Sequence, residues 1–150
     1  MIYTSLTKQA LKLAFEAHKE QVDKTGLPYV FHPFHLAEQM DDEVSTVCAL
    51  LHDVMEDTDY TLDDLKKMGY PSAVTDVLAL LTHEDGVPYE AYVEKVSVNA
   101  TARKVKLADL KHNSDLSRLD SVDEYALRRG EKYARAIAFL ENIERKNGNG

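Results

Sequence analysis

The segment ALLHDVMEDT occupies residues 49–58 of this chain. It ends an apolar run whose spacing predicts a buried helix over residues 43–55. His52 and Asp53 interrupt this run, and burying an imidazole next to a carboxylate is costly unless a partner satisfies both groups. Two interpretations stay open from the pattern alone: the pair binds a metal ion, or the two side chains form hydrogen bonds within the core.

One helical turn later the sequence adds two more ionisable side chains, Glu56 and Asp57. Each follows a residue of the His52-Asp53 pair by four positions, so it shares a helix face with that residue. Like charges this close repel one another, and a bound cation offsets the repulsion. Alternatively, Glu56 and Asp57 are simply the solvated end of the helix.

Helical periodicity extends over most of the chain, and no segment shows the sustained alternation that is typical of strands. The expected helices, besides residues 43–55, are residues 6–17, a segment that opens at Pro33, residues 62–68, a segment around residues 74–81, and residues 100–119 and 123–146. We therefore predict an all-α fold, a compact multi-helix bundle in one domain over residues 1–150, with a frayed tail over residues 147–150.

Two other places in the chain carry residue types that bind metal ions. His32 precedes Pro33, so we expect extended backbone at His32. His35 is one turn further on and is a candidate to support His32. Asp109 and Asn113 form a second pair at a spacing of four residues, among apolar neighbours. The alternative is an ordinary helix carboxylate and an exposed amide.

A single metal ion is the simplest cofactor for these residues. The candidate ligands are two imidazoles and two carboxylates, namely His32, His52, Asp53 and Asp109. Such a set suits Mn²⁺, Fe²⁺ or Zn²⁺ and leaves positions open for water and substrate. Lys24 and Lys106 are candidates to offset the charge of a phosphate, although most lysines on a helix surface are only solvated.

The composition limits which classes of function fit. Of 150 residues, 18 are Lys or Arg and 26 are Asp or Glu, which gives a formal net charge of −8. This charge argues against nucleic acid as the main partner, and a bound divalent cation would offset it for an anionic substrate. Cys48 is the one cysteine, no apolar run reaches membrane-spanning length, and the N-terminus lacks a signal-peptide pattern. We expect a cytoplasmic protein with no membrane partner.

Three segments of the chain, taken together, resemble the HD-domain metal phosphohydrolases and, among them, the hydrolase domain of the RelA/SpoT enzymes. The matching residues are Ala17-His18, Gln21, Thr25-Gly26, Pro28-Tyr29 and His32-Pro33 in the first segment, ALLHDVMEDT at 49–58 in the second, and KLADLKHN at 106–113 in the third. The three segments occur in the family's order and span residues 17–113.

The resemblance implies an all-helical HD-domain bundle with one Mn²⁺ ion bound by His32, His52, Asp53 and Asp109. It implies hydrolysis of the 3′-pyrophosphate of guanosine tetra- or pentaphosphate, so the expected partner is a small-molecule nucleotide; a homo-oligomer is left open. It assigns Glu56 and Asp57 to the catalytic step and Asn113 to the substrate ribose. Lys24 and Thr25 fall where the family binds the nucleotide.

Asp23 is a departure, because the family usually has an arginine there that packs against the guanine base. The sequence therefore supports a second hypothesis, an HD phosphohydrolase that acts on another nucleotide or phosphoester. A third hypothesis is a metal-stabilised or ligand-sensing module without activity, which the presence of Glu56 and Asp57 beside the ligand set disfavours. The chain is too short to include the synthetase domain of the long bifunctional RelA/SpoT enzymes, so synthesis of guanosine tetra- or pentaphosphate is not expected.

Overall fold

The computed structural model describes residues 1–148, and these residues form eight α-helices, one short 3₁₀-helix and no β-strand. The elements are α1 (Ser5–His18), α2 (Phe31–Glu38), α3 (Glu43–Asp57), α4 (Leu62–Lys67), α5 (Ser72–Leu81), α6 (Tyr89–Ser97), α7 (Ala100–Asn113), η1 (Leu116–Arg118) and α8 (Glu124–Gly148). The predicted all-α class is confirmed. None of the helices in residues 1–148 combines the length and the apolar character needed to cross a lipid bilayer.

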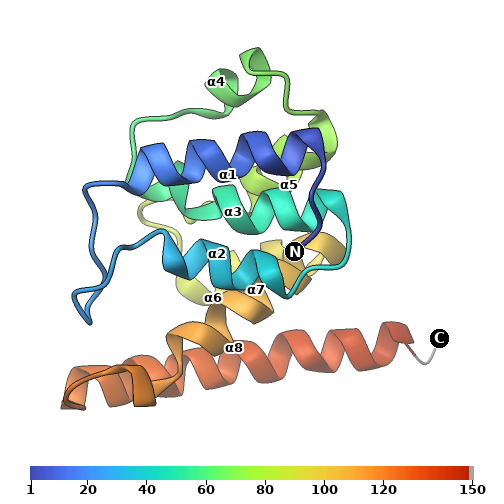
Figure 1. Ribbon diagram of the computed structural model, residues 1–150. Helices are drawn as coiled ribbons and strands as arrows, with labels where there is room; N and C mark the ends of the chain where they lie inside the picture. Colours follow the sequence, from blue (N-terminus) through green and yellow to red (C-terminus); the bar gives the residue numbers. More distant parts are fainter. Residues whose placement is uncertain (149–150) are drawn as a thin grey trace.

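Helix α3 is the centre of the bundle. It lies between α1 and α2, with α5 and α7 against its other sides (Figure 1). Every residue from Ser45 to Val54 is buried, so α3 has no solvent face over these three turns. His52 and Asp53 are therefore held inside the protein by the same helix that supplies much of the apolar core.

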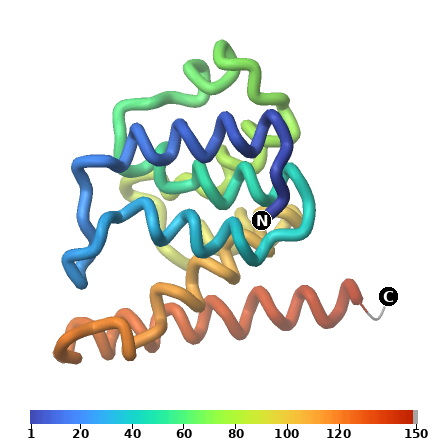
Figure 2. The backbone as a smooth tube through the Cα atoms, in the orientation of Figure 1, coloured from blue at the N-terminus to red at the C-terminus, as the bar shows by residue number. Residues whose placement is uncertain are grey.

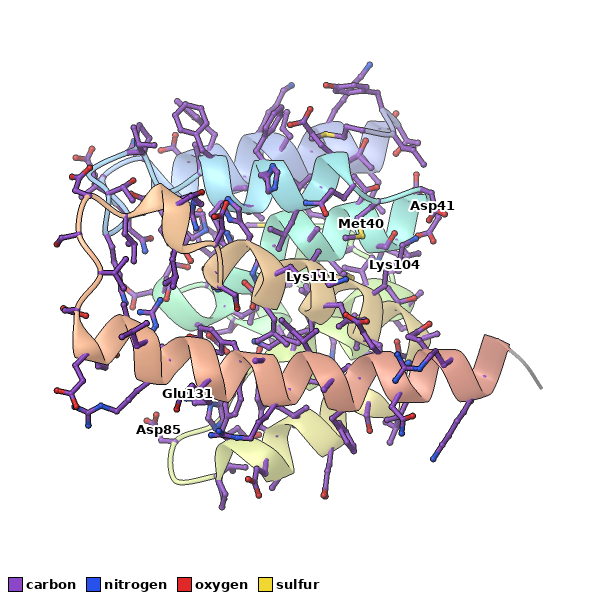
Figure 3. All side chains as sticks on the ribbon, turned by 90° about the horizontal axis from the view of Figure 1, so that it is seen from below. Met40, Asp41, Asp85, Lys104, Lys111 and Glu131 are labelled. Atoms are coloured by element: carbon purple, nitrogen blue, oxygen red, sulfur yellow. The ribbon has the colours of Figure 1, made fainter. Side chains whose placement is uncertain are left out.

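Helix α8 is the longest element and lies along one side of the bundle (Figure 1). Viewed from below, it crosses α6 and α7, against which it packs (Figure 3). The loop between α1 and α2 projects on the same side of the molecule as the connection between α7 and α8 (Figure 2). Two segments far apart in the sequence are thereby brought together next to α8.

Capping residues fix where several helices begin. Asp42 precedes α3, and its Oδ1 accepts a hydrogen bond of 2.7 Å from the backbone N–H of Ser45. A capping box formed by Thr61 and Asp64 precedes α4, since each side chain accepts from the other residue's backbone N–H.

Two local expectations are wrong. His32 does not have extended backbone: α2 already begins at Phe31, because the chain winds into a turn at Tyr29, whose carbonyl accepts from the His32 N–H at 3.0 Å. Pro33 is tolerated because it lies in the first turn, where its missing N–H costs nothing.

The helix expected over residues 100–119 ends at Asn113. Beyond it the Asp115 carboxylate accepts hydrogen bonds from both the N–H and the hydroxyl of Ser117, and this local turn replaces helix. Helix α6, which starts after Pro88, was not expected from the sequence. Helix α8 continues to Gly148, inside the stretch 147–150 expected to fray; residues 149–150 lie outside the described residues.

Candidate metal centre

Four buried side chains converge from three helices at the middle of the bundle. They are His32 from α2, His52 and Asp53 from α3, and Asp109 from α7. Each offers one ligand atom, and these four atoms all lie within 4.8 Å of one another. The structure thus brings together the four residues that the sequence singled out as candidate metal ligands.

The spacing of the donor atoms suits one ion. His32 Nε2 lies 2.9 Å from Asp109 Oδ1, and His52 Nε2 lies 3.0 Å from Asp53 Oδ2. The distances from His32 Nε2 to Asp53 Oδ2 and from His52 Nε2 to Asp109 Oδ1 are both 3.5 Å. Donors that share a cation at about 2.1 Å stand roughly 3–4 Å apart, so little movement is needed to surround a divalent ion.

The protonation of His52 supports the same conclusion. Its Nδ1 lies 2.7 Å from the carbonyl oxygen of Ala49, which only accepts, so Nδ1 carries the proton. The Nε2 atom is buried, has no hydrogen-bond partner among the described residues, and faces the carboxylates of Asp53 and Asp109. A lone pair aimed at two anions is unfavourable unless a proton or a metal cation lies between them.

The electrostatics of the cluster favour bound positive charge. Burial alone would lower the pKa of His52, but the carboxylates of Asp53 and Asp109 outweigh it and raise that pKa well above its ordinary value. The negative charge of these two carboxylates, which favours a proton on His52, would also favour a divalent cation between them. The buried cluster of histidine and aspartate is therefore consistent with a divalent metal site.

Neighbouring side chains hold the two carboxylates in place. The Tyr29 hydroxyl donates to Asp53 Oδ2 at 2.5 Å, Lys106 Nζ donates to Asp109 Oδ2 at 3.0 Å, and Asn113 Nδ2 donates to Asp109 Oδ1 at 3.1 Å. Burial would raise the pKa of Asp109, but the Lys106 ammonium and the two histidines hold that pKa well below its usual range. Asp109 stays ionised, as a metal ligand must be.

Glu56 and Asp57 lie at the end of α3, and different parts of the chain hold them. Glu56 Oε1 accepts a hydrogen bond of 2.8 Å from the backbone N–H of His83, whereas Asp57 Oδ2 accepts one of 3.3 Å from the side chain of Gln21. Burial, with the Asp53 charge, raises the pKa of both carboxyl groups. Glu56 lines the cavity next to the cluster, and Asp57 is not among its lining residues.

The inner cavity, as we call the space of about 220 Å³ beside the cluster, has a polar and aromatic wall. Its lining includes His52, Asp53, Glu56, His83, Tyr89, Tyr92, Lys106, Asp109, Asn113, Lys132 and Tyr133. The sequence expectations above include no role for His83, Tyr89, Tyr92 or Lys132. The one signal for the tyrosines was their spacing of three residues directly after Pro88, which opens α6.

The outer cavity, of about 280 Å³, adjoins the inner one and shares Tyr29, Asn113 and Tyr133 with it. Its other lining residues include Asp23, Lys24, Thr25, His32, Arg118 and Arg129. The cluster of four side chains lies between the two cavities, because His32 lines the outer one while His52, Asp53 and Asp109 line the inner one.

Asp23 is fully engaged in the wall of the outer cavity. Its Oδ1 accepts hydrogen bonds from the N–H and hydroxyl of Thr25 and from the N–H of Leu27, and its Oδ2 lies 3.5 Å from the Arg118 guanidinium. These bonds and the Arg118 charge keep the pKa of Asp23 below its usual value, although burial alone would raise it. Asp23 therefore shapes the loop and ties it to η1.

Comparison with known proteins gives relatives of one kind. Over 64 residues, 40% of this chain and 9% of the relative, the chain is 44% identical to a guanosine-3′,5′-bis(diphosphate) 3′-pyrophosphohydrolase of Aquifex aeolicus. Over 128 residues, 75% of the chain and 15% of the relative, it is 34% identical to a GTP pyrophosphokinase of Streptomyces coelicolor. The bifunctional (p)ppGpp synthase/hydrolase SpoT of Escherichia coli is 31% identical over 121 residues, 71% of the chain and 17% of that protein.

The chain thus spans less than a fifth of the length of these relatives. No model of a protein family matches it. Among solved structures, it is similar to a metazoan ortholog of SpoT described as hydrolysing ppGpp and acting in starvation responses, with a TM-score of 0.73 and 23% identity. That match covers 99% of this chain and 98% of the other, which shows that the two share one fold from end to end.

Proposed function

Because this chain belongs to the hydrolase domains of the RelA/SpoT family, we propose that it is a metal-dependent pyrophosphohydrolase. The proposed reaction removes the 3′-pyrophosphate of guanosine-3′,5′-bis(diphosphate), ppGpp. The observation that carries the proposal is the convergence of four buried metal-ligand side chains at the boundary of two adjoining cavities. The relatives named above support the choice of substrate.

The proposed cofactor is one divalent metal ion, Mn²⁺ in the first instance, held by His32, His52, Asp53 and Asp109. Mixed imidazole and carboxylate donors suit Mn²⁺, and they also suit Fe²⁺ and Zn²⁺. When bound, the ion supplies a Lewis acid that activates water and polarises a phosphoryl oxygen. Tyr29, Lys106 and Asn113 keep the carboxylate ligands oriented toward it.

Glu56 is the proposed proton acceptor. It lines the inner cavity, and the His83 N–H holds its carboxyl group in one orientation. Burial raises its pKa toward the pH range in which a carboxylate takes up and releases protons efficiently. Burial also raises the pKa of Asp57, and Gln21 holds its carboxylate, so we assign it a supporting role in the same step.

Positive side chains give an acidic protein a site for an anionic substrate. Lys106 and Lys132 line the inner cavity, where the leaving pyrophosphate would lie, and Lys132 stands over the Tyr89 ring at 4.1 Å. Lys24 and Thr25 line the outer cavity, where the nucleoside would lie, and Asn113 faces both. Together the cavities fall within the size range of small-molecule sites, about 300–1,000 Å³.

The test is a direct assay. Purified protein loaded with Mn²⁺ is incubated with ppGpp, and the products are separated by anion-exchange chromatography with mass spectrometry. We expect GDP and pyrophosphate in equal amounts, and no turnover after chelation. Intact ppGpp under conditions in which the same preparation hydrolyses a nucleoside monophosphate would overturn the proposal.

A second candidate substrate class follows from Asp23. Its carboxylate is engaged with Thr25, Leu27 and Arg118 and offers no surface on which a base could stack. A phosphohydrolase of the same mechanism that acts on another nucleotide or phosphoester fits this feature. A panel of phosphorylated metabolites in the same assay separates the two, since the ratio of kcat/KM values names the preferred substrate. We propose a cytoplasmic location, where a free thiol such as Cys48 stays reduced.

A further inference from the structure

We infer that His112 is a positioning residue of the metal centre: its imidazole holds the proton of His32 on Nδ1 and so leaves Nε2 of His32 free to bind metal. The inference rests on the metal centre proposed above and not on the identity of the substrate. His112 belongs to α7 and lies three residues after Asp109. Nothing in the sequence pattern pointed to this contact; the residue expected to support His32 was His35.

The geometry of the two rings is unusual. His32 Nδ1 and His112 Nδ1 are 2.6 Å apart, a hydrogen-bond distance, and the ring planes differ by only 11°. The ring centroids are 4.9 Å apart, far more than the nitrogen atoms, so the rings meet edge to edge in nearly one plane. Their in-plane nitrogen positions therefore point at each other, and one proton has to lie between them.

The location of that proton follows from the other side of the His32 ring. Nε2 of His32 points into the cluster, 2.9 Å from Asp109 Oδ1 and 3.5 Å from Asp53 Oδ2. A metal ligand must present a lone pair, so neutral His32 carries its single proton on Nδ1. His112 Nδ1 then has to accept, and the proton of neutral His112 resides on its Nε2.

Comparison with His52 shows what is special about this arrangement. The Nδ1 proton of His52 is donated to the carbonyl of Ala49, which cannot donate in return, so the tautomer of His52 is fixed. A histidine acceptor can adopt either tautomer. If the proton of His112 were on its Nδ1 instead, His112 would donate to Nδ1 of His32. The proton of His32 would then be on its Nε2 and be donated to Asp109, so His32 could not bind metal. The ligating state of His32 therefore depends on the tautomer of His112.

The surroundings hold His112 in place. Its backbone carbonyl accepts a hydrogen bond of 2.9 Å from Arg118, which reaches back from η1. His35 packs against the outer side of the His112 ring with a centroid distance of 4.4 Å, but it is itself exposed. His35 has ring contact with His112 alone among the described aromatic pairs, so it serves as a matched control.

The experiment compares three variants with the wild-type chain: His112→Leu, which removes the acceptor, His112→Gln, which offers an amide oxygen, and His35→Leu. Metal affinity is measured by competition with a chelator in the absence of substrate. We expect His112→Leu to bind Mn²⁺ about 10–100-fold more weakly, the usual effect of losing a group that orients a ligand. His112→Gln should recover part of this loss, and His35→Leu should bind as the wild type does.

A second measurement keeps the test independent of how well the variants fold. Nitrogen-15 NMR of wild-type protein loaded with diamagnetic Zn²⁺ reports which nitrogen of His32 carries the proton; we expect Nδ1. Wild-type affinity in His112→Leu, or a proton on Nε2 of His32 in the loaded protein, would overturn the inference. A failure of the ppGpp assay alone would leave both readouts unaffected, whereas a wild-type chain that binds no divalent ion would overturn the metal centre and the inference together.

Discussion

The two cavities of this protein lie next to each other but are built from different kinds of structure. Most residues that enclose the inner cavity belong to regular helices, with Tyr29 and His83 as the exceptions, and the cluster beside it is buried, with Asp53 only 9% exposed. The outer cavity is bounded in large part by the loop between α1 and α2 and by the connection around η1. An ion pair between Asp23 and Arg118 joins those two segments.

The difference assigns separate tasks to the two regions. Side chains on packed helices cannot move independently, so they suit a metal ion that requires fixed donor positions. Loop residues can change without loss of the core, so they suit the choice of substrate. Substitutions in the inner region should therefore abolish metal binding or chemistry, and substitutions in the outer region should change KM and leave the metal bound.

The largest effect is expected from Asp109→Asn. The amide keeps the shape of the side chain but loses the charge that binds the cation, and it leaves the Lys106 ammonium buried without its partner. Turnover should fall by at least about 10³-fold, because the Lewis acid contributes several kcal/mol. Metal content by mass spectrometry of the dialysed protein should fall with it. Stoichiometric metal in Asp109→Asn would show that Asp109 is not a ligand.

Glu56→Gln should have the next largest effect and should separate chemistry from metal binding. We expect kcat to fall by about 10²–10⁴-fold with unchanged metal content, since the variant loses a proton acceptor and no ligand. In the wild type, burial raises the pKa of Glu56, so kcat should decrease as the pH falls through that raised value, where the acceptor becomes protonated. This decrease of kcat at low pH should be absent from the residual activity of Glu56→Gln. If the decrease persists, a group other than Glu56 causes it.

How far the sequence predicts each region depends on the range of the contacts. His52, Asp53, Glu56 and Asp57 stand out locally, because ionisable residues at helical spacing inside an apolar run are visible in one window. The meeting of His32 with Asp109 joins residues 77 positions apart, and only their residue types and the family resemblance indicated it in advance. Local pattern therefore indicates ionic residues on a helix, and packing decides which of them meet.

Other features had no sequence signature at all. The hydrogen bond to Glu56 comes from the main chain of His83, which any residue could provide, and the contact between His32 and His112 depends on the packing of α2 against α7. The end of α7 was missed because the side-chain turn at Asp115 competes with helix over only a few residues. The hydrophobic periodicity of the sequence does not predict tertiary contacts of this kind.

The outer region can be probed with Asp23→Asn. The amide keeps an oxygen that accepts from Thr25 and Leu27 but removes a negative charge from the wall that faces an anionic substrate. We expect KM to fall several-fold, the effect of about 1 kcal/mol of relieved repulsion, with kcat and metal content unchanged. Asp41→Asn, a charge removal on the exposed turn before α3, is the control. A rise in KM would mean that the Asp23–Arg118 pair is needed to shape the cavity.

The smallest effect is expected where α3 begins, at the end of the helix remote from the cluster. Asp42→Ala removes the cap on the Ser45 N–H and should lower the free energy of unfolding by about 1 kcal/mol, measured by urea denaturation. Its neighbour Asp41 pairs with Lys104 at the surface, where both are labelled in Figure 3, and it is 81% exposed. Asp41→Ala should therefore leave stability unchanged within error.

The stability supplied by Asp42 should also depend on pH in a defined direction. The hydrogen bond from Ser45 lowers the pKa of Asp42 in the folded protein below its value of 3.8 in the unfolded chain. The contribution is therefore complete above the unfolded pKa and is lost as the pH falls through the folded one. The difference between wild type and Asp42→Ala should be constant from pH 6 to 8 and shrink below about pH 4, while metal affinity near neutral pH stays the same in both. A change in metal affinity in Asp42→Ala would show that the inner region is less rigid than its burial implies, because a cap three turns away would then reach the cluster.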